Sequence, residues 1–128
     1  MKVSLWLLAA VVQAPLLTSV PAMAADPMEV DASHHKLEFQ NNCVRVIRGS
    51  FGPGEKSDNL FDAKAVVVVA LTGSKATRLN LPDGKSVDLP PTNPGDTWWA
   101  PAGRIGVENT SDSRVEFLVI EPQTGCVN

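Results

Sequence analysis

The chain has 128 residues, 11 of them basic and 14 acidic, and a formal net charge of −3 at pH 7. This length suits one small domain with one hydrophobic core. A mildly acidic chain without a basic cluster argues against nucleic acid and anionic membranes as partners.

Residues 1–24 have the pattern of a secretory signal peptide. Lys2 supplies a positive charge, the apolar run from Leu5 to Val12 follows, and Ala22-Met23-Ala24 provides the small residues that a signal peptidase recognises. A membrane anchor is the weaker alternative, because the run is too short to span about 30 Å of hydrocarbon. We therefore predict cleavage after Ala24, a periplasmic or secreted protein, and no membrane contact after cleavage.

Beyond the signal peptide, residues 25–35 are predicted to be a flexible extension and residues 36–128 one domain. The domain is a series of short strands separated by turns rich in glycine and proline. In chain order the predicted strands cover residues 37–40, 43–51, 65–71, 76–81, 86–89, 97–100, 105–108 and 115–121. The four valines 66–69 suggest a strand buried on both faces, and Asp83-Gly84 predicts a hairpin turn. No segment has helical periodicity over ten residues, so the fold is all-β, a sandwich or a barrel.

The cysteines are Cys43 and Cys126. A pair of thiols in an exported protein tends to form a disulfide, and the absence of a C-x-x-C motif favours a structural bridge over a redox-active pair. The bridge would close a loop of about 84 residues and stabilise the fold by roughly 4 kcal/mol. Two free thiols are the alternative, because a bridge also requires the two Cα atoms to lie close together.

Residues 95–109 read GDTWWAPAGRIGVEN. They resemble the second signature motif of the cupin family, G-x5-P-x-G-x2-H-x3-N. Gly95, Pro101, Gly103 and Asn109 are matched to its glycines, proline and asparagine, and Gly106 is assigned to the histidine position.

The first cupin motif, G-x5-H-x-H-x3,4-E-x6-G, is matched by its two glycines, Gly54 and Gly73. Its histidine positions fall on Leu60 and Asp62, and its glutamate position falls on Val66 or Val67. The resemblance extends over about residues 36–122. It implies a double-stranded β-helix, or jelly-roll barrel.

Cupins normally hold a metal ion in the barrel mouth on three histidines and a glutamate. Of the residues in those positions only Asp62 offers a ligand atom, and one carboxylate does not hold a transition metal. We therefore predict neither a metal nor another cofactor. His34 and His35 precede the predicted barrel and are expected to be solvated, which leaves no general base in the mouth. A non-standard metal site that combines one of them with Asp62 is the alternative.

Trp98 and Trp99 are adjacent on a predicted strand, so one indole should face the interior and the other should not. The inward indole would belong to the core or to the wall of a pocket, and the outward one could mark a dimer interface. The predicted pocket consists of Leu60, Asp62, Trp98 and Gly106. Its single carboxylate would suit a small organic ligand with a hydrogen-bond donor or a positive charge.

Three functions fit these residues. The first is an exported single-domain cupin without the metal ligands, acting as a small-molecule binding or interaction module rather than as an enzyme. The second is a cupin-type enzyme, either isomerase-like with Asp62 as general base or dependent on a metal in a non-standard site. The third is a structural jelly-roll module that forms a homodimer. No catalytic residue is identified.

Overall fold

The computed structural model describes residues 14–15 and 24–126. The predicted signal peptide therefore lies almost entirely outside the described residues. No helix in the described part of the chain is long and apolar enough to cross a membrane.

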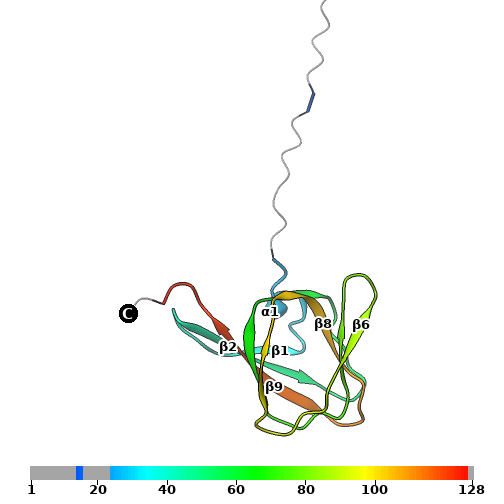
Figure 1. Ribbon diagram of the computed structural model, residues 1–128. Coiled ribbons are helices and arrows are strands. Elements are labelled where there is room, and N and C mark those ends of the chain that lie inside the picture. The colour runs from blue at the N-terminus through cyan, green and yellow to red at the C-terminus, as the bar shows by residue number, and fades with distance from the viewer. Residues whose placement is uncertain (1–13, 16–23, 127–128) are drawn as a thin grey trace, which may run out of the picture.

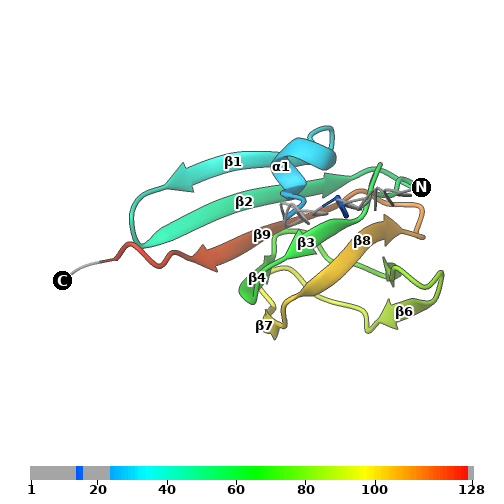
Figure 2. The same cartoon turned by 90° about the horizontal axis from the view of Figure 1, so that it is seen from above.

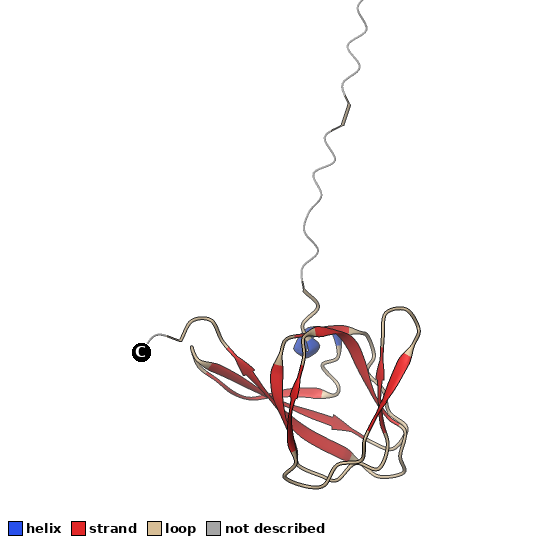
Figure 3. Ribbon diagram, viewed as in Figure 1, coloured by secondary structure: helices blue, strands red, loops and turns tan. Residues whose placement is uncertain are grey.

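The described chain is built almost wholly of strands, which confirms the all-β prediction (Figure 3). Eight of the nine strands overlap a predicted one. The elements are α1 (Pro27–Val30), β1 (His35–Gln40), β2 (Val44–Phe51), β3 (Phe61–Ala63), β4 (Val66–Ala70), β5 (Thr77–Asn80), β6 (Ser86–Leu89), β7 (Thr97–Ala100), β8 (Gly103–Asn109) and β9 (Val115–Pro122). The additional strand, β3, is only three residues long and depends on its pairing with β8.

The strands form two antiparallel sheets in a jelly-roll arrangement (Figure 1). The larger sheet has the order β1-β2-β9-β4-β7 and the smaller one β3-β8-β5-β6. The longest ladder joins strands from the two ends of the domain, with Val44 opposite Pro122 and Phe51 opposite Val115. Figure 2 shows β1, β2 and β9 side by side, with β3, β8 and β6 on the other side of the molecule.

Alternation along the strands decides which side chains face the space between the sheets. In β4 the side chains of Val66, Val68 and Ala70 are buried, whereas Val67 and Val69 are only half-buried. The prediction that this strand is buried on both faces is therefore wrong. Among the described residues no helix or strand covers the outer face of the larger sheet, and the buried residues of β4 are those of its inner face.

Two residues matched to the cupin motifs explain how the turns are held. Gly95 has a φ of 87°, a conformation that side chains with a Cβ rarely adopt. Asn109 is fully buried, and its Nδ2 donates hydrogen bonds to the carbonyl oxygens of Phe51, Gly52 and Ser113 at 2.7–3.1 Å. Asn109 thus ties the end of β8 to the end of β2 and to the turn that precedes β9.

The predicted disulfide between Cys43 and Cys126 is present, with the two Cα atoms 4.2 Å apart. It joins the β1–β2 turn to the segment that follows β9, at the tip of an arm that extends beyond the smaller sheet (Figure 2). The bridge closes a sequence separation of 83 residues.

Residues 25–35, predicted to be a flexible extension, contain α1 and pack against β1 and β3. Asp26 caps the helix by accepting a hydrogen bond from the backbone N–H of Met28 at 2.8 Å, and Pro27 suits the first helical turn. The prediction that His34 and His35 are solvated is wrong, because 9% and 7% of their surfaces are exposed. Both rings pack on Phe51, and both contact the fully buried Asp31.

Candidate functional site

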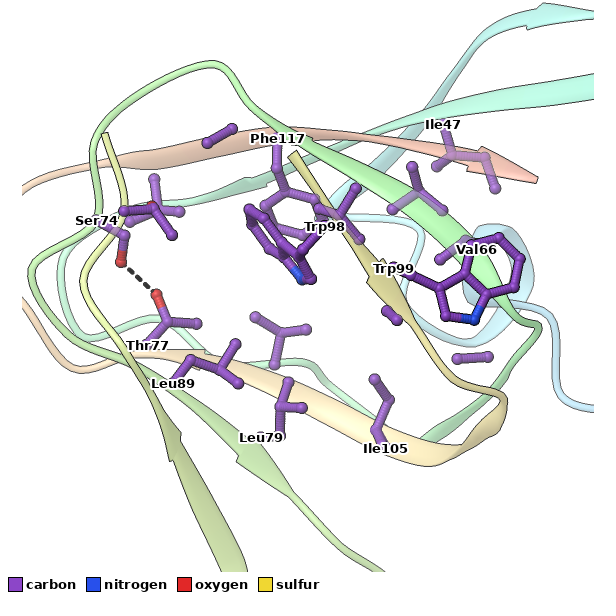
Figure 4. Close-up of a pocket in the computed structure, with 18 of the residues that line it drawn as sticks. Ile47, Val66, Ser74, Thr77, Leu79, Leu89, Trp98, Trp99, Ile105 and Phe117 are labelled. Atoms are coloured by element: carbon purple, nitrogen blue, oxygen red, sulfur yellow. Dashed lines mark hydrogen bonds between the residues drawn. The ribbon is translucent and has the colours of Figure 1, made fainter. Parts of the chain in front are cut away.

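A cavity of about 640 Å³ lies between the two sheets (Figure 4). Its walls are the inward side chains of both sheets, most of them aliphatic or aromatic. The larger sheet contributes Ile47, Val66, Val68, Ala70, Trp98, Phe117 and Val119, and the smaller sheet Phe61, Leu79, Leu89, Ile105 and Val107.

The two tryptophans point to opposite sides of β7, as adjacent strand residues should. Trp98 pairs with the inward Val68 and lies beside Phe117 in the cavity wall (Figure 4). Trp99 pairs with the outward Val67 and is 60% exposed, although it reaches the rim of the cavity. Of the four residues of the predicted pocket, Trp98 and Asp62 line the cavity.

Leu60 and Gly106, also predicted for the pocket, do not line the cavity. They meet each other outside it: Leu60 Cδ2 lies 2.9 Å from the position that a Cβ on Gly106 would occupy. Gly106 follows Ile105, which lines the cavity, and so has the opposite orientation. The missing side chain of Gly106 makes room for Leu60 rather than for a ligand.

Ile105 occupies the inward-facing position of the second motif, because this chain has one residue fewer than the motif before Asn109. Three residues should separate the histidine position from the asparagine, and only two lie between Gly106 and Asn109. Counting back from the buried Asn109 assigns the histidine position to Ile105. Ile105 pairs with Phe61 of β3, which also faces the cavity.

These inward residues do not fit the metal ion that the cupin resemblance implies. Phe61, Ala63 and Ile105 occupy the facing positions of β3 and β8, and none of them carries a ligand atom. The side chains on this part of the wall therefore offer packing surface only.

Asp62 also differs from its predicted role as a free carboxylate in the mouth. Its Oδ2 accepts a hydrogen bond from the backbone N–H of Ala25 at 2.7 Å, and Oδ1 lies 3.1 Å from Nη1 of Arg104. The residue lines the cavity at the end next to α1. Because both oxygens are engaged, Asp62 is poorly placed to act as a general base.

His34 lies in a cluster of acidic residues that connects α1 to the loop after β2. Its Nδ1 is 2.7 Å from Asp31 Oδ1, and its Nε2 is 3.0 Å from Glu55 Oε2. Burial lowers the pKa of His34, but hydrogen bonds with Asp31 and Glu55 and the charges of Asp31 and Asp58 outweigh burial and raise the pKa overall. The geometry therefore suits an imidazolium held between two carboxylates.

Asp31, His34 and Asp58 also bring one potential ligand atom each within 4.8 Å of one another. Metal binding requires an unprotonated ring nitrogen, whereas both nitrogens of His34 already face carboxylates. Asp31 Oδ1 and Asp58 Oδ2 accept further hydrogen bonds, from the backbone N–H of Asp58 and from Ser33 Oγ. Hydrogen bonds thus already occupy the atoms of this cluster that would otherwise bind a metal ion.

His35, the first residue of β1, lines the cavity, whereas His34 does not. Its ring makes edge-on contacts with Phe51 and Phe61, at centroid distances of 5.9 and 5.2 Å. Burial in this apolar setting lowers the pKa of His35, although Asp31 partly offsets the effect. The sequence analysis did not assign His35 to the cavity, although the opposite orientation of adjacent strand residues predicts that one of the two histidines faces inward.

A second buried charge cluster lies at the same end of the cavity. Glu121 is 4% exposed and lies 3.1 Å from Nη2 of Arg45 and 3.2 Å from Nζ of Lys64. Burial raises the pKa of Glu121, but its hydrogen bonds with Arg45, Gln123 and Lys64 outweigh burial, and the pKa falls overall. Arg45 also donates to Asp26 at 2.7 Å, so two basic and two acidic side chains balance one another in this cluster.

No family model and no curated protein matches the chain. Solved structures do match it. The chain is similar to a cupin domain from Bordetella pertussis, with 27% identity and a TM-score of 0.62 over 70% of this chain and 92% of that chain. A cupin 2 conserved barrel domain protein from Salinispora arenicola has 20% identity and a TM-score of 0.50, over 77% of this chain and 87% of that chain.

A third similar structure is an enzyme, a DMSP lyase from Ruegeria pomeroyi. It has 14% identity and a TM-score of 0.50, and the match covers 73% of this chain and 48% of that chain. At that identity the likeness concerns the fold alone. The two-sheet topology, the turn glycine Gly95, the buried Asn109 and the likeness to solved cupin domains together show that this chain has the cupin fold, and they support its assignment to the cupin family.

Proposed function

We propose that this protein is an exported cupin that binds an apolar small molecule between its two sheets, without a metal in the barrel. The cavity of about 640 Å³ carries the proposal, because its volume lies within the range of ligand sites and its walls are predominantly apolar. The facing residues Phe61 and Ile105 support a site without a metal, since they offer no ligand atom.

Export is supported by the signal-peptide pattern and by the disulfide, which persists in oxidising compartments. The contact between Ala25 and Asp62 adds to this. Cleavage after Ala24 would convert the Ala25 nitrogen, 2.7 Å from Asp62 Oδ2, into an ammonium group beside a carboxylate. Mass spectrometry of the exported protein should find Ala25 as its first residue, and any other start would contradict this cleavage site.

A pair of adjacent substitutions tests the binding proposal. Val68 faces the cavity and Val67 faces outward on the same strand, so V68F fills the site whereas V67F does not. We expect at least one compound of a metabolite library to raise the Tm of the protein. V68F should weaken its binding at least about tenfold, and V67F should leave it within about twofold. A library without any stabilising compound, or equal effects of the two variants, would contradict the proposal.

A second candidate function, a module that forms a homodimer, is favoured by the outer face of the larger sheet. Phe39, Val46, Ile120, Val67 and Trp99 lie in register across its five strands, one from each strand. The two ends of this row, Phe39 and Trp99, are 51% and 60% exposed. A continuous apolar row of this kind is typical of an interaction surface.

A further inference from the structure

The surroundings of Nδ1 determine which ring nitrogen of His35 carries the proton when the ring is neutral. The backbone oxygen and the Oδ2 of Asp31 both lie 3.1 Å from this nitrogen. The backbone carbonyl makes the hydrogen bond with Nδ1, and it can only accept because it has no proton. Nδ1 must therefore carry the ring proton, and Nε2 of the neutral ring has a free lone pair.

His35 lines the cavity with an almost fully buried side chain. Its Nδ1 is bonded to Asp31, and Nε2 has no hydrogen-bond partner among residues 14–15 and 24–126. Burial, which lowers the pKa of His35, keeps the ring neutral and its lone pair free.

Several charged and polar groups of the cavity already have protein partners. Glu121 is held by Arg45 and Lys64, Asp62 by Ala25 and Arg104, and Ser74 Oγ bonds to Thr77 Oγ1. A charged ligand would find no unpaired counter-charge among these groups. An uncharged apolar ligand would instead meet the ring nitrogen of His35.

We propose that His35 Nε2 is the hydrogen-bond acceptor of the ligand site, and that the ligand is an uncharged apolar molecule with a hydroxyl or N–H group, such as a phenol or an alcohol. The hydroxyl would bond to Nε2 at the α1 end of the cavity, and the apolar body would extend along Trp98 and Phe117. This inference rests on the proposed binding function and adds the chemistry of its ligand.

Two probes of nearly the same shape test the acceptor: 2-naphthol, which has an O–H donor, and 2-methoxynaphthalene, which has none. Titrations followed by tryptophan fluorescence should show 2-naphthol binding about fivefold tighter to the unmodified protein. H35F keeps an aromatic ring and removes the acceptor, so its two affinities should agree within about twofold. The control W98L should weaken both probes and preserve their ratio.

Nitrogen-15 NMR of the unmodified protein supplies a test that does not depend on a variant folding. The Nε2 resonance of His35 should have the position of an unprotonated ring nitrogen. It should move when 2-naphthol is added and stay in place with 2-methoxynaphthalene.

The outcomes separate the two proposals. Equal affinities of the unmodified protein for both probes, or 2-naphthol binding that leaves Nε2 unperturbed, would overturn the role of His35 and leave the binding function intact. No binding of either probe up to its solubility limit would count against the binding function and, with it, the inference.

Discussion

His34 and His35 are neighbours in the chain and have opposite electrostatic environments. His34 lies between Asp31 and Glu55, which favour its protonated form, whereas His35 lies against Phe51 and Phe61, which favour its neutral form. The difference follows from the contacts of the two rings: His35 lines the cavity, whereas His34 is bonded to carboxylates at both of its ring nitrogens. One side chain stabilises the N-terminal segment, and the other reaches the cavity.

These opposite shifts predict that stability is greatest near the ordinary histidine pKa of about 6.5. The raised pKa of His34 contributes stability below pH 6.5, which is lost as the pH rises through its folded-state value. The lowered pKa of His35 contributes stability above pH 6.5, which is lost as the pH falls toward its folded-state value.

Urea unfolding between pH 5 and pH 9 would measure both effects. H34Q should flatten the decline of the unfolding free energy above pH 6.5, and H35F should flatten the decline just below it. Profiles of both variants that parallel that of the unmodified protein would show that neither ring controls the pH dependence.

At the scale of the elements, β1, β2 and β9 extend beyond the smaller sheet and form the arm that the disulfide closes (Figure 1). The arm has no second sheet to pack against. Leu37 and Phe39 of β1 are accordingly 41% and 51% exposed. Ladder hydrogen bonds and the covalent bridge therefore supply much of its order.

Removing the bridge should destabilise the protein without altering the cavity. The double variant C43S/C126S loses roughly 4 kcal/mol in the chain-entropy model, enough to lower the Tm by at least about 10 °C. Probe affinity measured well below the Tm should change less than about twofold, because neither cysteine lines the cavity. An unchanged Tm would mean that the strand ladders alone hold the arm.

The molecule as a whole presents two different surfaces on its larger sheet. The inner face lines the cavity, and the outer face carries the row Phe39, Val46, Ile120, Val67 and Trp99. Charged pairs such as Arg48 with Glu38 lie close to this row. A second copy of the chain is the partner that we expect on this face.

Sedimentation velocity would measure that association. The unmodified protein should form dimers at micromolar concentrations, and W99K should shift it to monomers by at least tenfold in Kd. V87K is the matched control, since Val87 is 48% exposed on β6 of the other sheet. A monomeric unmodified protein, or equal effects of the two substitutions, would contradict a dimer through this face.

The sequence by itself determined the all-β class, the positions of eight strands and the hairpin turn at Asp83-Gly84, and it offered one possible disulfide, between Cys43 and Cys126. The strands and turns follow from local residue preferences and from motif residues such as Asn109. The disulfide follows from each cysteine having one possible partner. The direction of each side chain within the motifs depended on the tertiary structure. This chain has one residue fewer than the motif between Gly103 and Asn109, which is visible in the sequence, and the pairing of Phe61 with Ile105 shows which side chain of β8 faces the cavity as a result.

The cavity and its histidine were likewise decided by tertiary structure. Alternation predicts that His34 and His35 point apart, but their neighbours come from segments distant in sequence: Phe51, Glu55 and Phe61. Only the packing of residues 25–35 against the sheets favours the protonated form of His34 and the neutral form of His35. Burial and partner distance set the pKa of an ionisable group, and both arise from contacts that no local pattern encodes.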